Sequence, residues 1–147
     1  MKTLQGEYTI SDEKNLLDLK IIHKYLSEES YWCNGIPIEI VAKSIDGSHC
    51  FGLYYFEKQI GFARVVTDHA TFAYLADVFI LSEHQGKKLS KWLMKTIVEH
   101  PKFQNLRRWM LATRDAHSLY EQFGFKPLEK PDRFMELHNP DAYQKKS

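Results

Sequence analysis

The sequence predicts a single domain of the mixed α/β class, in which helices flank a central, mostly antiparallel sheet. Its 147 residues, 44% of them apolar, suffice for one hydrophobic core but not for two. Three runs rich in aromatic and β-branched residues follow one another between residues 49 and 80, separated only by short turns. Such an arrangement favours an antiparallel meander, and segments with helical periodicity precede and follow it.

The first 48 residues are expected to form one short strand and two helices. The strand covers residues 8–10, and Ser11 can cap a helix that runs from residue 12 to about residue 27. Residues 31–37 form an aromatic loop of the kind that often borders a pocket. Pro37 suits the first turn of a second helix, which continues to Ile45.

The remaining elements follow in an order that alternates strands and helices. Gly124 and Pro101 mark the ends of two of the helices. The predicted strands are residues 49–56, 60–67, 71–80, 107–113 and 134–137, the predicted helices are residues 86–99 and 115–123, and residues 57–59 form the first hairpin turn.

Composition restricts the class of partner. A net charge of +1 and a pI near 7.8 argue against a nucleic-acid-binding protein, so any recognition of phosphate should be local. The sequence has no apolar run near the ~20 residues that span a membrane, and its first residues lack the hydrophobic core of a secretory signal. We therefore expect a cytoplasmic protein with no membrane partner.

The cysteines and histidines suggest no metal centre. Cys33 and Cys50 lack the CxxC spacing, so reduced structural thiols are favoured over a disulfide, with a reactive thiol as the minority interpretation. The seven histidines never fall at a spacing such as HExxH, and we assign no metal.

The most informative stretch is LADVFILSEHQGKKLSKWL, residues 75–93. A hydrophobic strand passes through a tight turn that contains Gly86 into an amphipathic helix. The start of a helix carries unpaired N–H groups and the positive end of the macrodipole, so it can hold a pyrophosphate. Four lysines follow at residues 87, 88, 91 and 95. They fit an ordinary solvated helix face, but a bound polyanion would relieve their mutual repulsion.

A second stretch, TRDAHSLYEQFGF at residues 113–125, completes a pattern. Together the two stretches resemble the GNAT family of N-acetyltransferases, whose phosphate loop reads Q/R-x-x-G-x-G/A and whose later helix reads N-x-x-A-x-x-L/F-Y-x-x-x-G-F. The resemblance covers about residues 51–137. It implies the acetyltransferase fold and acetyl-CoA as cosubstrate.

The resemblance also implies cofactor-binding positions. Lys88 stands where the family usually has glycine, and Ser90 where it has glycine or alanine, so the lysine either obstructs the phosphates or pairs with them. Thr113 replaces a common asparagine and offers only part of its hydrogen-bonding capacity. The backbone of the preceding strand would contact the pantetheine arm and stabilise the oxyanion. The expected cofactor-binding residues are Val78, Phe79, Ile80, Gln85, Gly86, Lys87, Lys88, Leu89, Ser90, Lys91 and Thr113.

Tyr120 is the expected catalytic residue, because it matches the tyrosine that protonates the leaving thiolate in the family. An ordinary phenol is a weaker acid than a thiol by about 1.5 pKa units, so hydrogen bonding to the thiolate is an acceptable weaker role. The base stays open: Ala76 occupies the position of the usual glutamate, and alternation along the strand puts Asp77 on the opposite face, where a structural role is preferred. Glu83 and His84 lie in the turn, where capping of the helix by Glu83 is at least as plausible as a catalytic role.

The leading hypothesis is acetyl transfer to a primary amine of a small molecule, with Tyr31, Trp32 and Tyr74 contacting this acceptor. Three alternatives stay open: acetylation of a protein N-terminus or lysine, a non-catalytic domain that binds acyl-CoA, and a purely structural domain. The sequence does not fix the oligomeric state, and a homodimer is compatible with it.

Overall fold

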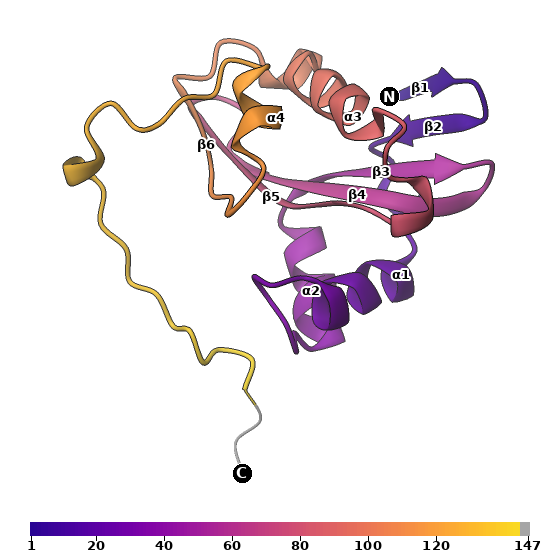
Figure 1. Cartoon of the computed structure of the whole chain (residues 1–147), viewed down its shortest axis with the longest axis horizontal. Coiled ribbons are helices and arrows are strands. Elements are labelled where there is room, and N and C mark those ends of the chain that lie inside the picture. The colour runs from indigo at the N-terminus through magenta and orange to yellow at the C-terminus, as the bar shows by residue number, and fades with distance from the viewer. Residues whose placement is uncertain (145–147) are drawn as a thin grey trace.

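The computed structural model describes residues 1–144, and its centre is a six-stranded sheet whose strand order repeats the order along the chain (Figure 1). Neighbouring strands are antiparallel except β5 and β6, which run parallel. The strands are β1 (Lys2–Gln5), β2 (Tyr8–Ser11), β3 (His49–Tyr55), β4 (Lys58–Thr67), β5 (Phe72–Ile80) and β6 (Arg108–Leu111). The predicted mixed, mostly antiparallel sheet is confirmed.

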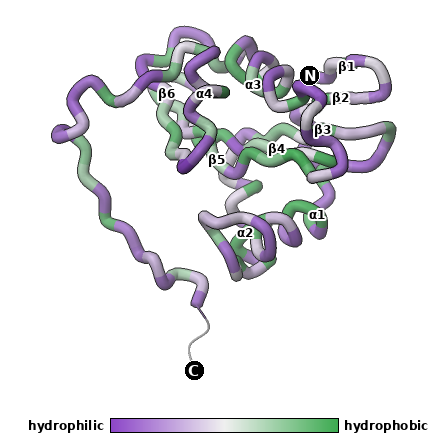
Figure 2. The backbone as a smooth tube through the Cα atoms, in the orientation of Figure 1, coloured by the Kyte–Doolittle hydropathy of each residue, from purple (hydrophilic) through white to green (hydrophobic). Residues whose placement is uncertain are grey.

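Helices cover both faces of this sheet. Helices α1 (Leu19–Lys24) and α2 (Ile38–Asp46) lie on one face, and α3 (Leu89–Val98) and α4 (His117–Glu121) on the other (Figure 1). Two clusters of buried side chains result, one between the sheet and α3 with α4, and one between the sheet and α1 with α2. In Figure 2 the central strands and the inner sides of the helices carry most of the hydrophobic colour. No helix among residues 1–144 is long and apolar enough to cross a membrane.

The sheet opens at one place, beside the second half of β5. The parallel pairing of β5 with β6 ends at Leu75 and Leu111. Just beyond it, the pairing of β5 with β4 shifts register between Phe62 and Arg64, because β5 carries an extra residue there. Strands β5 and β6 therefore diverge beyond Leu75, and a cleft forms between them.

The amino-terminal region differs from the prediction in two ways. Strand β1 was not expected, yet it pairs with β2 along its whole length. The first helix does not begin after Ser11, whose hydroxyl accepts the N–H of Glu13 in a local turn. The cap is Asp18, which accepts the N–H groups of Lys20 and Ile21, and the helix ends in a π-turn over Tyr25–Glu29.

In the second half, the elements are shorter than predicted, and one is missing. A 3₁₀ turn (Ser82–His84) separates β5 from α3, which starts at Leu89 and not at Gly86, because Gly86 and Lys88 both adopt positive φ angles. The predicted strand at residues 134–137 is wrong. This segment is extended but pairs with no strand of residues 1–144, since the chain carries it away from the sheet (Figure 1).

Residues 126–142, which we call the tail, are all exposed. Beyond the tail the chain returns to the body at Tyr143, which packs against the cluster beneath α1 and α2. An added Cβ at Gly35, in the aromatic loop, would lie 3.4 Å from the carbonyl oxygen of Tyr143, which places the two segments in close contact.

Candidate active site

The start of α3 is an uncapped helix terminus. Its first intrahelical bond runs from the N–H of Trp92 to the carbonyl of Lys88, and no side chain among residues 1–144 caps the helix. The N–H groups of Leu89, Ser90 and Lys91 thus precede the first helical hydrogen bond. Free amides at the positive end of a ten-residue helix are suited to binding an anion.

The turn before α3 shapes a small hollow around these amides. Gly86 has a φ of +81°, a conformation that side chains rarely adopt. Gln85 fixes the turn by donating its side-chain amide to the carbonyl of Ile80 at 2.9 Å. The hollow has a volume of about 240 Å³ and is lined by Ile80, His84, Gln85, Gly86, Lys88, Leu89, Ser90, Lys91 and Leu119.

The lysines at this helix start do not all face the hollow. Lys88 and Lys91 line it, whereas the ammonium of Lys87 lies 3.4 Å from the hydroxyl of Tyr8 on β2. Lys88 has a φ of +61°, which is the left-handed conformation. A residue with a Cβ pays about 1–2 kcal/mol there, which explains why glycine is usual at this position of the phosphate loop.

The bulge of β5 is built around Asp77, which also has a left-handed backbone, with a φ of +54°. Its carboxylate accepts one hydrogen bond from Nε of Arg64 and another from Nε1 of Trp32, both at 2.8 Å. Arg64 also donates to the hydroxyl of Ser48. The structural role preferred for Asp77 agrees with these contacts, although the bulge, and not simple alternation, directs its side chain.

Beyond the bulge, the three residues expected to contact the cofactor through their backbone point their side chains to different sides. Phe79 stacks on Tyr25 with ring centroids 4.0 Å apart, in the cluster beneath α1 and α2. Val78 packs toward the opposite cluster and lines the cleft. On the β4 side, Phe79 and Ile80 pair with Phe62 and Gly61, while no residue of β6 pairs with them on the other side.

Tyr120 lies on α4, across the cleft from β5, and is only 8% exposed. Its hydroxyl makes no hydrogen bond to any residue of the described chain, and the side chain lines the cleft. Burial, with a smaller effect of Tyr31, raises the pKa of Tyr120 to about 12. The phenol is therefore a proton-bearing donor at neutral pH, without a protein partner.

Thr113 lies two residues beyond the end of β6, where it supports α4. Its hydroxyl oxygen accepts the N–H of Ala116 at 3.0 Å, which holds the turn that carries Tyr120. The hydroxyl hydrogen is left for another acceptor. Thr113 also lines the cleft.

The aromatic loop closes the other end of the cleft. The hydroxyl of Tyr31 accepts the N–H of Arg114 at 3.0 Å, and the Arg114 guanidinium lies 3.9 Å from the centre of the Tyr31 ring. These contacts join the loop to the turn before α4. The resulting pocket has a volume of about 620 Å³, and Tyr31, Trp32, Tyr74, Asp77, Val78, Thr113 and Tyr120 are among the residues that line it.

Similarity to known proteins shows the family of this chain. The family profile of the acetyltransferase (GNAT) domain matches residues 46–127. The chain belongs to the GNAT family of acetyltransferases. A Gibberella zeae protein that carries an acetyltransferase name is 32% identical over 87% of this chain and 84% of its own.

Solved GNAT structures share the fold. A crystal structure from Xanthomonas campestris pv. campestris, of a protein assigned to the GNAT family, is 46% identical, covers 94% of this chain and 97% of its own, and superposes with a TM-score of 0.92. A GNAT acetyltransferase from Elizabethkingia anophelis, solved with acetyl-CoA bound, is 13% identical, covers 90% of this chain and 88% of its own, and has a TM-score of 0.63. The latter likeness concerns the fold alone.

Sequence reasoning missed two parts of this GNAT site. The first is Arg64, whose charge in the middle of an otherwise apolar strand was a signal that a buried partner exists. The second is the end of the chain: residues of the tail and Tyr143 form one wall of the pocket, and no motif pointed to them. These residues are His138, Asn139, Pro140, Ala142 and Tyr143.

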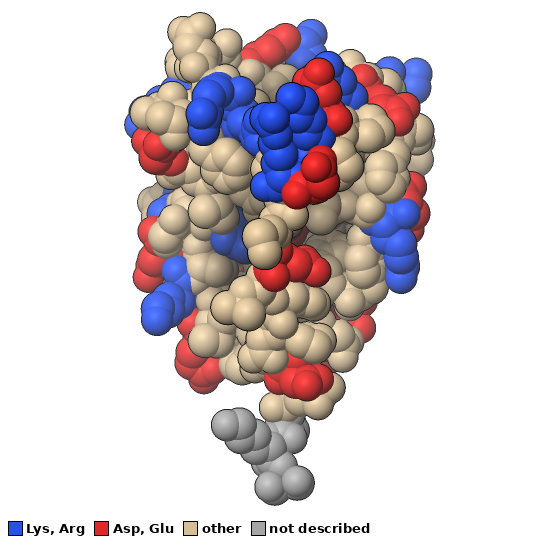
Figure 3. Space-filling model, turned by 90° about the vertical axis from the view of Figure 1, so that its left-hand side faces the viewer, with Lys and Arg blue, Asp and Glu red and all other residues tan. Residues whose placement is uncertain are grey.

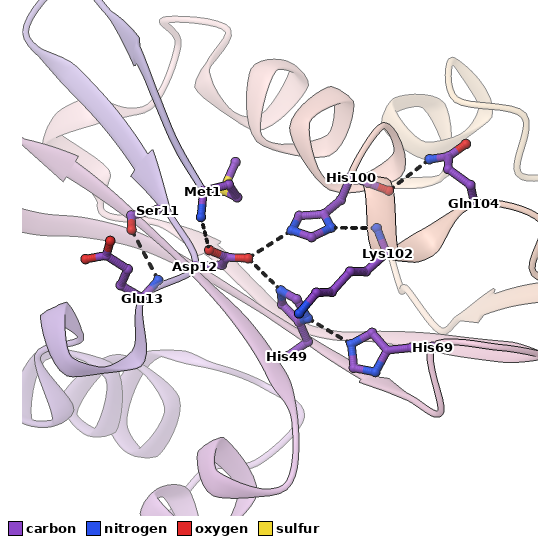
Figure 4. Close-up of polar contacts among 9 residues, drawn as sticks. All are labelled: Met1, Ser11, Asp12, Glu13, His49, His69, His100, Lys102 and Gln104. Atoms are coloured by element: carbon purple, nitrogen blue, oxygen red, sulfur yellow. Dashed lines mark hydrogen bonds and ion pairs between the residues drawn. The ribbon is translucent and has the colours of Figure 1, made fainter.

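A second polar cluster joins β2, β3 and the end of α3, apart from the cleft (Figure 4). One carboxylate oxygen of Asp12 accepts from Nε2 of His49 at 2.8 Å and from Nε2 of His100 at 2.9 Å. The other oxygen accepts from the Met1 amino group, and Nδ1 of His49 lies 2.9 Å from Nε2 of His69.

This arrangement has the composition of a metal site, but hydrogen bonding accounts for it. Nδ1 of His100 accepts the N–H of Lys102, so in the neutral ring the proton must sit on Nε2, which faces Asp12. A nitrogen that carries a proton cannot bind a metal. We therefore describe these residues as a polar hub that ties three elements together.

Proposed function

We propose that this acetyltransferase uses acetyl-CoA and transfers the acetyl group directly from the thioester to a primary amine of a small molecule. The observation that carries the proposal is the uncapped start of α3, which follows the bulged strand β5 and lies beside the cleft that Tyr120 lines. An anion-binding helix terminus, an open strand edge and an unpartnered phenol are the groups that this reaction requires.

The residues present fit the cosubstrate. The amides of Leu89, Ser90 and Lys91 would bind the pyrophosphate, with the ammonium groups of Lys88 and Lys91 as charged partners. The unpaired edge of β5 at residues 78–80 would hold the pantetheine arm. Acetyl-CoA in the Elizabethkingia anophelis neighbour supports this choice of acyl donor.

The chemistry joins a nitrogen to the acetyl carbon and releases a thiolate. Backbone N–H groups at the bulge would stabilise the negative charge that develops on the thioester oxygen, because they are rigid and unpaired on the β6 side. Tyr120 would donate its hydroxyl hydrogen to the departing sulfur. With a phenol pKa of about 12 and a thiol pKa of ~8.5, full proton transfer is uphill by about 5 kcal/mol, so a hydrogen bond to the thiolate is the favoured role.

The proton lost by the amine leaves through water. Both carboxylate oxygens of Asp77 already accept hydrogen bonds from Arg64 and Trp32, and the side chain of Ala76 cannot accept a proton. Neither residue therefore acts as the general base. A solvent molecule in the pocket can accept this proton from an amine that is already activated by attack.

The acceptor is a small molecule on this proposal because the pocket is closed on two sides. The aromatic loop covers one side and the tail, with Tyr143, another. Its volume of about 620 Å³ falls within the usual range of ~300–1,000 Å³ for small-molecule sites. A protein acceptor would need an open groove for its chain, and a non-catalytic acyl-CoA-binding domain would leave the unpartnered Tyr120 hydroxyl without a role.

The experiment is a screen of thiol release from acetyl-CoA with two matched panels, one of small primary amines and one of peptides with free N-termini or lysines. Turnover with small amines and not with peptides is the expected result. Turnover with peptides alone would show that the acceptor is a protein and not a small molecule. Thermal stabilisation by coenzyme A without turnover on either panel would support a non-catalytic binding domain. If coenzyme A does not stabilise the protein at all, the proposed pyrophosphate site at the start of α3 is rejected.

A further inference from the structure

Large apolar side chains gather around the pocket that Tyr120 lines. Four of them keep much of their surface exposed: Tyr31, Trp32, Tyr74 and Ile40 are 47%, 40%, 37% and 41% exposed, and all four line the pocket. Single exposed apolar residues are common on a protein surface, but several around one hollow indicate a binding site. A ligand with an apolar body would cover them.

The two aromatic side chains of the loop are held in fixed positions. The hydroxyl of Tyr31 accepts the N–H of Arg114, and the indole of Trp32 donates to Asp77. The two rings lie edge to face, with centroids 5.0 Å apart. Because the protein already satisfies the polar atoms of both rings, they offer a ligand mainly apolar surface.

The charged side chains of the pocket are few and lie in pairs of opposite sign. Seen from the side on which the tail lies, Lys and Arg gather mainly in the upper part of the molecule, and much of the surface below is uncharged (Figure 3). Of the chain's 20 lysines and arginines, Arg64 and Arg114 line the pocket. Arg64 donates to Asp77 at 2.8 Å, and the guanidinium of Arg114 lies 3.9 Å from the carboxylate of Asp115. These four charges cancel, and His138 is the further basic side chain of the lining.

A second charge on the acceptor would find no free partner inside this pocket. A carboxylate, as in an amino acid, needs a free cation, but Arg64 is bound to Asp77. A second ammonium, as in a polyamine, needs a free carboxylate, but both oxygens of Asp77 already accept hydrogen bonds. Arg114 and Asp115 are mostly exposed, so water screens their charges. Burial of an unpaired charge is costly, which disfavours both classes of acceptor.

We propose that the acetyl acceptor is a primary monoamine whose apolar body carries an aromatic ring. This inference rests on the proposed function and names the substrate class of the same site. The ring of the acceptor packs against Trp32 and Tyr74, and its amine lies toward Val78 and the thioester. Apolar surroundings favour the uncharged form of an amine, which is the form that attacks, and this fits a site where Ala76 replaces a carboxylate.

The reaction itself is unchanged by this choice of acceptor. The lone pair of the amine nitrogen forms the bond to the acetyl carbon, and the carbon–sulfur bond breaks. Its electron pair leaves with the sulfur as the thiolate of coenzyme A. The extra proton on the nitrogen passes to water.

The first test compares kcat/KM for matched amines by thiol release from acetyl-CoA. Phenethylamine and phenylalanine differ by one carboxylate, with phenylalaninamide as the control for branching, and hexylamine and hexamethylenediamine differ by one amine. The monoamine should be preferred about 10²-fold or more in both pairs, because the second charge lies unpaired. Phenethylamine should exceed ethylamine by about 10–10²-fold, because only phenethylamine buries a ring.

Tyr74→Ala tests the apolar wall. The variant should lower the preference for phenethylamine over ethylamine about tenfold, because the ring of the acceptor loses a contact surface. Phe72→Ala is the matched control, since Phe72 lies two residues earlier on β5, is similarly exposed and does not line the pocket. It should keep the preference of the unaltered chain. Circular dichroism checks that both variants are folded.

Ile40→Asp tests the absence of a free carboxylate. The variant adds an unpaired negative charge to the lining, so the activity with hexamethylenediamine relative to hexylamine should rise about tenfold. Val66→Asp places the same charge on a similarly exposed residue of β4 that does not line the pocket, and it should leave this ratio unchanged.

The outcomes separate this inference from the proposed function. A preference for phenylalanine or for hexamethylenediamine over its matched monoamine would overturn the acceptor class, while acetyl transfer to small amines would stand. Amine preferences that stay the same in both Tyr74→Ala and Ile40→Asp would also overturn it. If none of the small amines is acetylated, the proposed function is rejected together with this inference.

Discussion

The indole Nε1–H of Trp32 donates to the carboxylate of Asp77 at 2.8 Å, and this bond joins the aromatic loop to the bulge of β5. The second oxygen of the same carboxylate accepts from Arg64 on β4. One side chain therefore positions both the strand expected to hold the acyl donor and the loop expected to cover the acceptor. Asp77 thus shapes the site and takes no part in the chemistry.

Asp77→Asn should reduce stability by about 1–3 kcal/mol, because one of the two donors then faces an amide NH₂. Asparagine tolerates the left-handed backbone, so the bulge itself should remain. Urea unfolding measures the loss, and we expect KM for the amine to rise more than the dissociation constant of acetyl-CoA. The milder Trp32→Phe should lose only about 0.5–1.5 kcal/mol. Equal stability of both variants and the unaltered chain would show that the carboxylate does not position the loop.

Tyr120→Phe should lower kcat by roughly 10²-fold or more, because it removes the donor to the leaving sulfur. Binding of acetyl-CoA should change little, since the ring and its packing remain. Steady-state kinetics and calorimetric titration measure the two effects. An unchanged kcat across the pH range would remove Tyr120 from the mechanism.

Lys88→Gly should have opposite effects on stability and binding. The fold should gain about 1 kcal/mol, because glycine adopts the φ of +61° without strain. Acetyl-CoA should bind modestly more weakly, with a flatter salt dependence, because a charge beside the phosphates is lost. Affinities at two salt concentrations decide: tighter binding would show that the lysine obstructs the phosphates. The control Lys95→Gly removes a lysine that does not line the hollow. The affinity of this variant for acetyl-CoA should stay close to that of the unaltered chain.

Tyr54→Phe should stabilise the fold by about 1 kcal/mol. The Tyr54 hydroxyl is buried without a hydrogen-bond partner among residues 1–144, and burial raises its pKa to about 12. Tyr8→Phe is the matched control, because the hydroxyl of Tyr8 bonds Nδ1 of His84 at 2.8 Å and its loss should destabilise the protein. Thermal unfolding compares the two. A destabilised Tyr54→Phe would mean that a water molecule satisfies this hydroxyl.

The polar hub should make stability fall in acid in two stages. Burial lowers the pKa of His49 below 6.5, against the raising effect of Asp12, so the folded state prefers the neutral ring and loses stability as pH falls below 6.5. Burial raises the pKa of Asp12, but hydrogen bonds from the amino terminus, His49 and His100 outweigh it and bring the pKa to about 2, so a second loss follows as pH falls from 3.8 toward 2.

Urea unfolding at pH 7.5, 5 and 2.5 measures both stages. His49→Gln should remove the first stage, so its difference from the unaltered chain should shrink between pH 7.5 and pH 5. An identical pH dependence of the two proteins would contradict the assignment to His49.

Much of the fold followed from local sequence. The meander of β3, β4 and β5 was predictable because aromatic and β-branched runs alternate with short turns, and Gly124 marked the end of α4 with a φ of +92°. Motifs singled out Gln85, Gly86 and Tyr120, and the structure places these residues in the walls of the two hollows. Their roles in cofactor binding and catalysis stay predictions.

The rest depends on contacts between distant residues. Asp18, and not Ser11, caps α1, and the backbone N–H of Asp18 donates to the buried Gln59, 41 positions away, a bond that no local pattern contains. The bulge at Asp77 needs Arg64 and Trp32 in place before it is favourable. Residues 134–137 have the composition of a strand but pair with no strand among residues 1–144, and sequence pattern reports propensity, not partners.

Because the six strands lie in the sheet in chain order, each new strand meets its neighbour as soon as it is synthesised. The nascent chain can therefore assemble β1 to β5 while α3 and β6 are still being translated. The wall that carries Tyr120 is added last and by a parallel pairing, across an intervening helix. In a chain cut short before β6, the outer edge of β5 would have no partner strand.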